Sequence, residues 1–229
     1  MKTTLLHHLQ FNAKSLEFSI LINISIQIAN GMAYLEKEKC IHRDLAARNV
    51  LVGESLTCKI AGFELAEIVE DDVVKADSNF KFPIKWTACE TFTSYPHESS
   101  TKSDVWSFGV LFWEIITCGC LPYPGMTNAQ VQEEIVKGYR MPNPSGNPDQ
   151  LCSNAGEKTW QNVLALRLFV INSKSFSLTR VLHILQMAEY MPLIAHLKSE
   201  KPSSMNALYI VRKETLQKSR TTKTVKYYL

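Results

Sequence analysis

The spacing of apolar and polar residues predicts helices at three places in the first 140 residues. Residues 17–38 carry apolar side chains over much of a helical circumference and end in the charged stretch "EKEK". Residues 103–117, "SDVWSFGVLFWEIIT", are apolar on almost every side, which predicts a central buried helix with Ser103 as its N-cap. A further helix begins within residues 128–139. The pattern therefore predicts a mainly helical chain.

Short strands and loops are expected between these helices. Residues 41–49 are polar and predict a loop, whereas residues 50–52 and 58–61 predict two short strands on either side of a turn at residues 53–54. Residues 65–82 carry acidic side chains and few periodic apolar positions, so they are expected to form a long surface loop. Loops of this length are often functional.

The two ends of the chain differ in character from its middle. Residues 1–16 predict a loose leader, and residues 17–152 predict a folded domain. Residues 153–229 are interpreted as a divergent basic tail, within which residues 175–199 have helical apolar spacing. The last stretch, residues 201–229, holds seven Lys or Arg against one Glu. Such a cluster attracts acidic lipid or nucleic acid, but without clear amphipathic spacing a disordered or poorly packed tail is favoured.

Composition narrows the class of protein. The 229 residues are 45% hydrophobic and 21% charged, which is typical of a soluble globular protein. A net charge of +3 is too small to indicate a nucleic-acid partner. Six cysteines without a Cys-x-x-Cys pair favour reduced thiols in a cytoplasmic protein over a zinc site or disulfides. The apolar run at residues 18–29 contains polar residues and is too short to span a membrane.

Three motifs, in order along the chain, resemble those of protein kinases. They are "HRDLAARNVLV" from residue 42, "FPIKWTACE" at residues 82–90 and "KSDVWSFGV" at residues 102–110. "HRDLAARN" followed by "PIKWTA" resembles a tyrosine kinase, and within this class the Src-related non-receptor group. The order Ala46-Ala47-Arg48 is more similar to the Frk, Brk and Srms branch than to Src itself. The resemblance implies an α+β, mainly α fold, namely the larger C-terminal lobe of a kinase domain over residues 17–152, truncated at both ends.

The resemblance also implies catalytic and binding roles for four residues. Asp44 would accept the proton of the substrate hydroxyl, and Arg48 would orient the phosphate and the incoming tyrosine. Asn49 would hold one Mg²⁺ through its amide oxygen, and Leu51 would lie under the adenine of ATP. Phosphoryl transfer requires mainly such positioning and charge stabilisation from the protein.

Other residues of the motifs are expected to have structural roles. His42 and Phe63 would stack in the internal apolar spine, and Asp104 would hydrogen-bond to the backbone of the catalytic loop. For His42, Arg43 and Asp104 the structural role is favoured, because buried polar groups need partners whether or not chemistry occurs. Glu90 is expected to be a buried charge whose usual arginine partner is not recognisable. Three tryptophans are expected in the core: Trp86, Trp106 and Trp113.

The segment "KIAGFELAE" at residues 59–67 departs from the family pattern. It aligns with the metal-binding Asp-Phe-Gly motif, but Gly62 stands at the aspartate position and Glu64 at the glycine position. A charged oxygen ligand for Mg²⁺ is therefore missing. Val74 stands where Frk- and Src-like kinases have a phosphorylated tyrosine, and Cys89 replaces the proline of the Ala-Pro-Glu motif. The glycine-rich loop, the lysine and the glutamate of the smaller lobe would precede residue 17 and are not found there.

Three functions remain open from the sequence. The first is an active tyrosine kinase that transfers the γ-phosphate of ATP to protein tyrosine with Asp44 as base. The second is a pseudokinase-like binding module that holds a protein partner through Arg48, residues 82–90 and residues 128–139. The third is a degenerate product with little function. The departures at Gly62 and beyond favour a lineage of tyrosine kinases whose activity is lost or very weak.

Overall fold

The computed structural model describes residues 3–70, 73–76 and 81–141. The predicted helical spacing at residues 175–199 and the predicted basic tail at residues 153–229 lie outside the described residues. The described part is a mainly helical α+β arrangement with three small antiparallel sheets. This mixed composition agrees with the predicted fold class.

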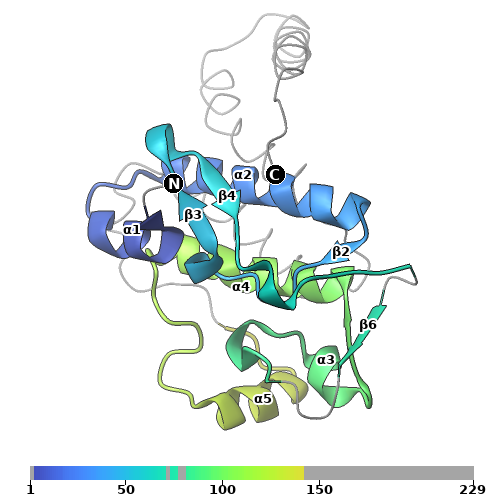
Figure 1. The fold of residues 1–229 in the computed structure, drawn as a ribbon. Helices are drawn as coiled ribbons and strands as arrows, with labels where there is room; N and C mark the ends of the chain where they lie inside the picture. The colour runs from blue at the N-terminus through green and yellow to red at the C-terminus, as the bar shows by residue number, and fades with distance from the viewer. Residues whose placement is uncertain (1–2, 71–72, 77–80, 142–229) are drawn as a thin grey trace, which may run out of the picture. The chain divides into compact units, whose positions relative to one another are not determined.

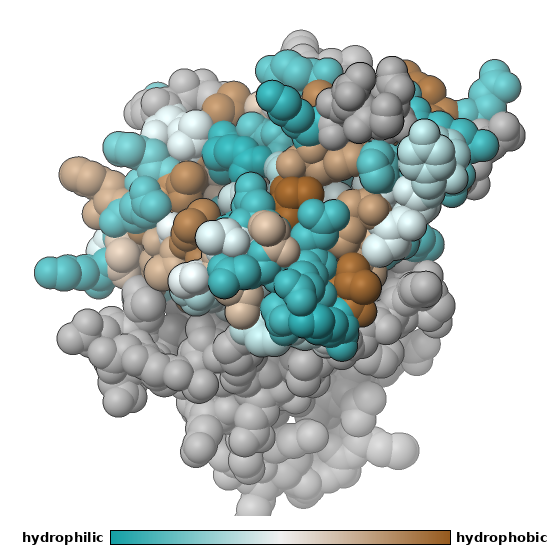
Figure 2. Space-filling model, turned by 90° about the horizontal axis from the view of Figure 1, so that it is seen from below, coloured by the Kyte–Doolittle hydropathy of each residue, from teal (hydrophilic) through white to brown (hydrophobic). Residues whose placement is uncertain are grey.

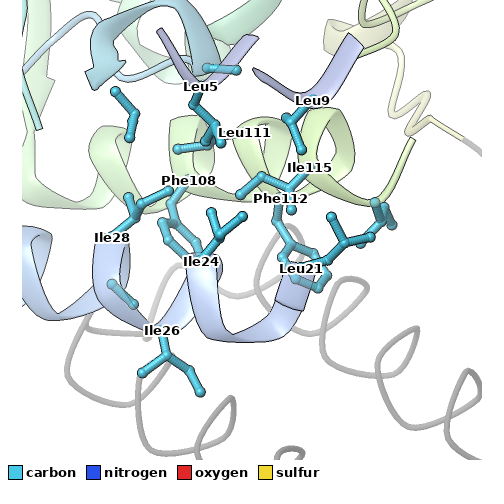
Figure 3. Close-up of a cluster of buried hydrophobic side chains, with 14 of the residues drawn as sticks. Leu5, Leu9, Leu21, Ile24, Ile26, Ile28, Phe108, Leu111, Phe112 and Ile115 are labelled. Carbon is cyan, nitrogen blue, oxygen red and sulfur yellow. The ribbon is translucent and has the colours of Figure 1, made fainter. Parts of the chain in front are cut away.

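Two long helices run side by side through the middle of the described part, as Figure 1 shows: α2 (Phe18–Lys37) and α4 (Thr101–Ile116). Both predicted helices are thus confirmed to within two residues at each end. Figure 3 shows their apolar side chains meeting between them, with Ile24 of α2 close to Phe108 of α4. The burial of nearly all of α4 agrees with its uniformly apolar sequence.

The helix α4 begins earlier than predicted. Ser100, rather than Ser103, is the N-cap: its hydroxyl accepts a hydrogen bond from Lys102 N, and the Ser103 hydroxyl accepts one from Ser100 N. The two serines form a reciprocal capping box in which Ser103 occupies the third helical position. The N-cap prediction is wrong because either serine suits this motif and only the backbone geometry distinguishes them.

The predicted loose leader is wrong for residues 3–12. The strand β1 (Thr3–Thr4) pairs with β3 (Val50–Val52), and Thr4 caps the helix α1 (Leu5–Asn12). Leu5 and Leu9 are each 0% exposed, and both point into the cluster of Figure 3. Since side chains four residues apart lie on one helical face, a single turn of spacing is sufficient to anchor α1 in the core.

Strands occupy part of the predicted surface loop at residues 65–82. The strand β5 (Glu67–Ile68) pairs with β2 (Cys40–Ile41), and β6 (Val73–Ala76) pairs with β7 (His97–Ser100). Val74, in β6, is only 3% exposed. The loop prediction fails here because each strand pairs with a segment far away in the sequence, which local composition does not reveal.

The predicted hairpin between residues 50 and 61 is confirmed and rests on α2. The strands β3 and β4 (Cys58–Ile60) are antiparallel, and the short helix η2 (Glu54–Leu56) forms the turn. The side chain of Gln27 in α2 donates to Leu56 O at 3.1 Å and accepts from Cys58 N at 2.9 Å. These two hydrogen bonds hold the hairpin, and therefore the chain on both sides of it, against the helix.

The remaining elements lie on the side of α4 opposite to α2 in Figure 1. They are η4 (Ile84–Trp86), α3 (Cys89–Thr93) and α5 (Asn128–Val136). The predicted helix at residues 128–139 is confirmed but ends at residue 136. Trp106 and Trp113 of α4 pack in a second apolar cluster with Val131 and Ile135 of α5. Two short helices lie close to the candidate site: η1 (Ala47–Asn49) and η3 (Phe63–Leu65).

Candidate active site

The start of the loop at residues 42–49 is held by a carboxylate from α4. Asp104 accepts hydrogen bonds from His42 N at 2.7 Å and from Arg43 N at 3.0 Å. Arg43 has a left-handed backbone with φ of 69°, an unfavourable conformation for a residue other than glycine. Burial raises the pKa of Asp104 to about 6, although the two amide bonds and Arg43 act in the opposite direction. Asp104 thus stabilises an otherwise strained turn.

His42 links this loop to the segment that contains Gly62. Its Nε2 lies 2.9 Å from Ala61 O, and its Nδ1 lies 3.3 Å from Asp44 N, which donates to it. These contacts fit a neutral ring with the proton on Nε2. Burial lowers the pKa of His42, against a smaller opposite effect of the bond to Ala61. The ring lies 5.1 Å from that of Phe63, centroid to centroid, so the two rings are in contact as expected. The rings are tilted by 56° rather than stacked, and Phe63 is 47% exposed, so the expected internal position of Phe63 is wrong.

The carboxylate of Asp44 is oriented by the two residues assigned beside it. Arg48 forms an ion pair with Oδ1, and Asn49 Nδ2 donates to Oδ2 at 2.7 Å. The same Asn49 nitrogen also lies 2.7 Å from Asp44 O. The structure therefore brings Asp44, Arg48 and Asn49 together, with both carboxylate oxygens engaged.

Two residues that the sequence did not single out for the site stand behind Arg48. The Arg48 guanidinium carbon lies 4.3 Å from the centre of the Trp86 ring. The Trp86 indole N–H donates to Glu114 Oε2 at 2.9 Å, and the same oxygen accepts from Ala47 N at 3.0 Å. Burial raises the pKa of Glu114, whereas these hydrogen bonds and Arg48 lower it. Glu114 was missed because it sits in an otherwise apolar helix with no motif of its own.

A further ion pair joins the loop to β5. The Arg43 guanidinium, almost fully buried, pairs with Glu67, which is about half-exposed. Glu67 follows Gly62 by five residues, so the ion pair connects the loop at residues 42–49 to the chain just after Gly62. Together with the His42 contact to Ala61, it holds both ends of the segment around Gly62.

Gly62 itself lies against Asn49. Its φ of 75° is in the left-handed region, and a Cβ added there would lie 2.5 Å from Asn49 Cγ and 2.7 Å from Asn49 Oδ1. The amide of Asn49 thus fills the place where a side chain at residue 62 would begin. Glu64 is exposed in η3, and no group of three His, Cys, Asp or Glu suited to a metal occurs among the described residues.

Two other predicted site residues belong to β3 and α3. Leu51 is half-buried in the middle strand of the sheet, where it is opposite Thr4 and Lys59. Glu90 is half-buried and not fully buried, and it accepts a hydrogen bond from Cys89 Sγ at 3.4 Å. The predicted cost of a fully buried charge at Glu90 is therefore overestimated, because solvent still reaches this residue.

Comparison with known proteins identifies the family of this chain. The family model described as protein tyrosine and serine/threonine kinase matches residues 1–170. The chain belongs to this kinase family. The match begins within the first residues, in agreement with the ordered strand β1 and helix α1 at this end.

Individual relatives of this kinase are Src-related tyrosine kinases. Tyrosine-protein kinase SRK3 of Spongilla lacustris is 53% identical over 138 residues, covering 60% of this chain and 41% of the relative. Tyrosine-protein kinase SRK2 of the same sponge is 51% identical over 150 residues, covering 66% and 41%. Tyrosine protein-kinase src-1 of Caenorhabditis elegans is 47% identical over 162 residues, covering 69% and 30%. The chain spans less than half the length of each. Within the described residues, no helix is long and apolar enough to cross a membrane.

Kinases of this family use ATP and Mg²⁺, but the residues around Gly62 do not fit such a metal. A hard cation is held by oxygen ligands, usually with at least one carboxylate. Asn49 Oδ1 faces a glycine, and both oxygens of Asp44 are engaged by Arg48 and Asn49. The arrangement orients a carboxylate well but offers the cation one amide oxygen where the family pattern has an additional aspartate.

Proposed function

We propose that this chain is the larger lobe of a non-receptor tyrosine kinase domain of the Frk, Brk and Srms type, whose ATP-dependent phosphorylation of protein tyrosine is lost or very weak. The tyrosine kinases among its relatives support the lineage. The single observation that supports the loss is the close packing of Asn49 on Gly62, at the position of the family's metal-binding aspartate. Reduced cysteines and the lineage make a cytoplasmic location part of the proposal.

The substrate side of the site remains organised for a protein hydroxyl. Asp44 is the group that would accept a hydrogen bond from the tyrosine hydroxyl, and Arg48 would hold the substrate beside it. Asn49 would remain the one Mg²⁺ ligand and Leu51 the residue under the adenine, as the family resemblance implies. What is missing is charge stabilisation, and loss of one well-placed electrostatic group typically lowers a rate by about 10²–10³.

The test is phosphorylation of a tyrosine-containing peptide with Mg-ATP by the unchanged chain and by Asp44→Asn. Because the proposal leaves the site at most a very weak activity, the unchanged chain is expected to give a signal close to the background that Asp44→Asn gives. The variant retains a side chain of the same shape, and a matched melting temperature would show that its fold is intact. Activity in the unchanged chain that disappears in Asp44→Asn would establish the alternative, an active kinase with Asp44 as its base.

A second candidate, a protein-binding module, is favoured by the support that the loop at residues 42–49 receives from within the chain, through Asp104 and Glu114. The proposed docking surface is formed by Arg48, residues 82–90 and residues 128–139. Figure 2 views the described part from the side on which α3 and α5 lie in Figure 1, and shows apolar and polar residues interspersed there, which suits a protein partner held by mixed contacts. This candidate predicts that a tyrosine-containing peptide binds the chain without nucleotide, and that Arg48→Ala weakens binding. Equal binding by the variant would exclude this surface.

A further inference from the structure

Trp86 is held by a hydrogen bond at each of its polar atoms. Its backbone N–H donates to Pro83 O at 2.8 Å, and its carbonyl accepts from the Ser107 hydroxyl at 2.8 Å. Its indole N–H donates to Glu114 at 2.9 Å. On the preceding residue, the Lys85 ammonium donates to Pro122 O at 2.9 Å and tethers the same segment to the turn before α5. Trp86 is therefore fixed in position and in ring orientation.

The two buried tryptophans of α4 show that packing does not require this arrangement. Trp106 and Trp113 are each 6% exposed, and the indole nitrogen of each lacks a hydrogen-bond partner within the part of the chain that the structure describes. Trp86 is only half-buried, yet its indole is paired with a buried carboxylate. Burying a carboxylate costs free energy. The Trp86 indole belongs to a more exposed residue than the indoles of Trp106 and Trp113, so it needs a hydrogen-bond partner less than they do. We therefore assign Glu114 the role of fixing the orientation of the Trp86 ring.

The oriented ring has one charged neighbour on its face. The Arg48 guanidinium lies over the Trp86 ring at 4.3 Å, within the range of a cation–π contact, and forms its ion pair with Asp44 from there. A chain of contacts thus runs from α4 to the candidate site: Glu114, Trp86, Arg48 and Asp44. Each link is a direct contact between neighbouring side chains.

We infer that Trp86 is a positioning residue for Arg48, and that Glu114 holds the Trp86 ring in the orientation that this requires. Neither residue touches the reacting groups of the proposed reaction. Their effect is on the direction of the Arg48 guanidinium, which orients the Asp44 carboxylate. The inference rests on the proposed function for its catalytic consequence, but its structural content can be tested alone.

The structural test uses NMR of the full chain labelled with ¹⁵N-arginine. A guanidinium above an indole ring experiences its ring current, so the Arg48 side-chain signal is expected upfield of its position in the absence of the Trp86 ring. Trp86→Leu should abolish this shift, Trp86→Phe should retain part of it, and Glu114→Leu should reduce it. Glu114→Gln should retain it, because the amide oxygen still accepts from the indole. An unchanged Arg48 signal in Trp86→Leu would overturn the inference.

The chain contains a matched control. Arg140 lies 4.6 Å from the centre of the Trp106 ring, without a carboxylate on that indole. Its signal should keep its own shift in every variant of Trp86 and Glu114, which also reports that the fold is intact. If Glu114→Leu fails to fold, hydrogen exchange in the unchanged chain replaces it. Slow exchange of the Trp86 indole N–H supports the role of Glu114, and fast exchange overturns it.

The catalytic consequence is measured in a Gly62→Asp background. If that change restores phosphorylation, Trp86→Leu should lower kcat about 2- to 30-fold, the size of a cation–π contact, with little change in the KM for ATP. A lower kcat with an unchanged Arg48 signal would contradict the positioning role. If Gly62→Asp restores no activity while the Arg48 signal responds as expected, the positioning role holds and the link between Gly62 and lost activity fails.

Discussion

Gly62→Asp restores a carboxylate at the position where the family's metal-binding motif has an aspartate. The structure around Gly62 indicates how much stability this substitution would cost. The backbone at residue 62 is left-handed, a region that aspartate enters more readily than most residues. The new Cβ would lie 2.5 Å from Asn49 Cγ, which is closer than carbon atoms can approach. Asn49 would therefore have to turn away from Asp44 and give up its two hydrogen bonds to that residue.

The expected loss of stability follows from these two effects. The left-handed backbone costs a residue with a side chain about 1 kcal/mol. Two net hydrogen bonds contribute about 1–3 kcal/mol together. The sum, about 2–4 kcal/mol, corresponds to a fall in Tm of about 4–16 °C for a chain of this size. Gly62→Ala introduces the same Cβ without a carboxylate, so it is the matched control and should show a similar fall.

The assay is thermal unfolding with and without Mg²⁺. Only Gly62→Asp offers the cation a carboxylate beside Asn49 Oδ1, so only this variant should be stabilised. At about ten times the Kd, a bound ion contributes about 1.4 kcal/mol. Stabilisation of the unchanged chain or of Gly62→Ala by Mg²⁺ would refute the reasoning that Gly62 removed a metal ligand. An undiminished Tm in Gly62→Asp would refute the close packing of Asn49.

Two further predictions concern stability. Burial raises the pKa of Asp104 to about 6 from 3.8, so its contribution to stability is full below pH 4 and is lost as pH rises through 6. Relative to Asp104→Asn, the unchanged chain should lose about 3 kcal/mol in urea unfolding between pH 3 and 7, of which about 2 kcal/mol falls between pH 4 and 6. A constant difference between the two proteins would contradict this. Leu9→Ala should cost about 2–5 kcal/mol because Leu9 is fully buried, whereas Phe11→Ala, at an exposed position, should cost less than about 0.5 kcal/mol. Equal losses of stability in the two variants would contradict the packing of α1 against the core.

The elements that were predictable from the sequence are those with a strong local signal. The apolar circumference of residues 103–117 specified a buried helix, and the motif at residues 42–49 specified which side chains meet at Asp44. The helix α1 was missed because eight residues with two buried leucines give little periodicity. Strand β6 was missed because its pairing partner, β7, lies more than twenty residues further along the chain.

The contact of Glu114 with the site could not be predicted for a related reason. Its two hydrogen-bond partners, Ala47 and Trp86, are 67 and 28 residues away in sequence. A carboxylate in an apolar helix signals only that some partner must exist, since an unpaired buried charge is costly. Which groups satisfy it depends on how α4 passes behind the loop, which is a property of the tertiary fold.

The same arrangement explains how a kinase fold can persist after its metal motif has changed. The loop at residues 42–49 is held at its beginning by Asp104 and in its second half by Glu114, and both carboxylates come from α4. None of these contacts involves residue 62. Under the proposed function, the change at Gly62 removes a ligand without removing a support of the loop, and the packing of Asn49 on the glycine closes the space. Support of the loop and the proposed metal binding are therefore separable in this site, because the hydrogen bonds from Asp104 and Glu114 do not pass through residue 62.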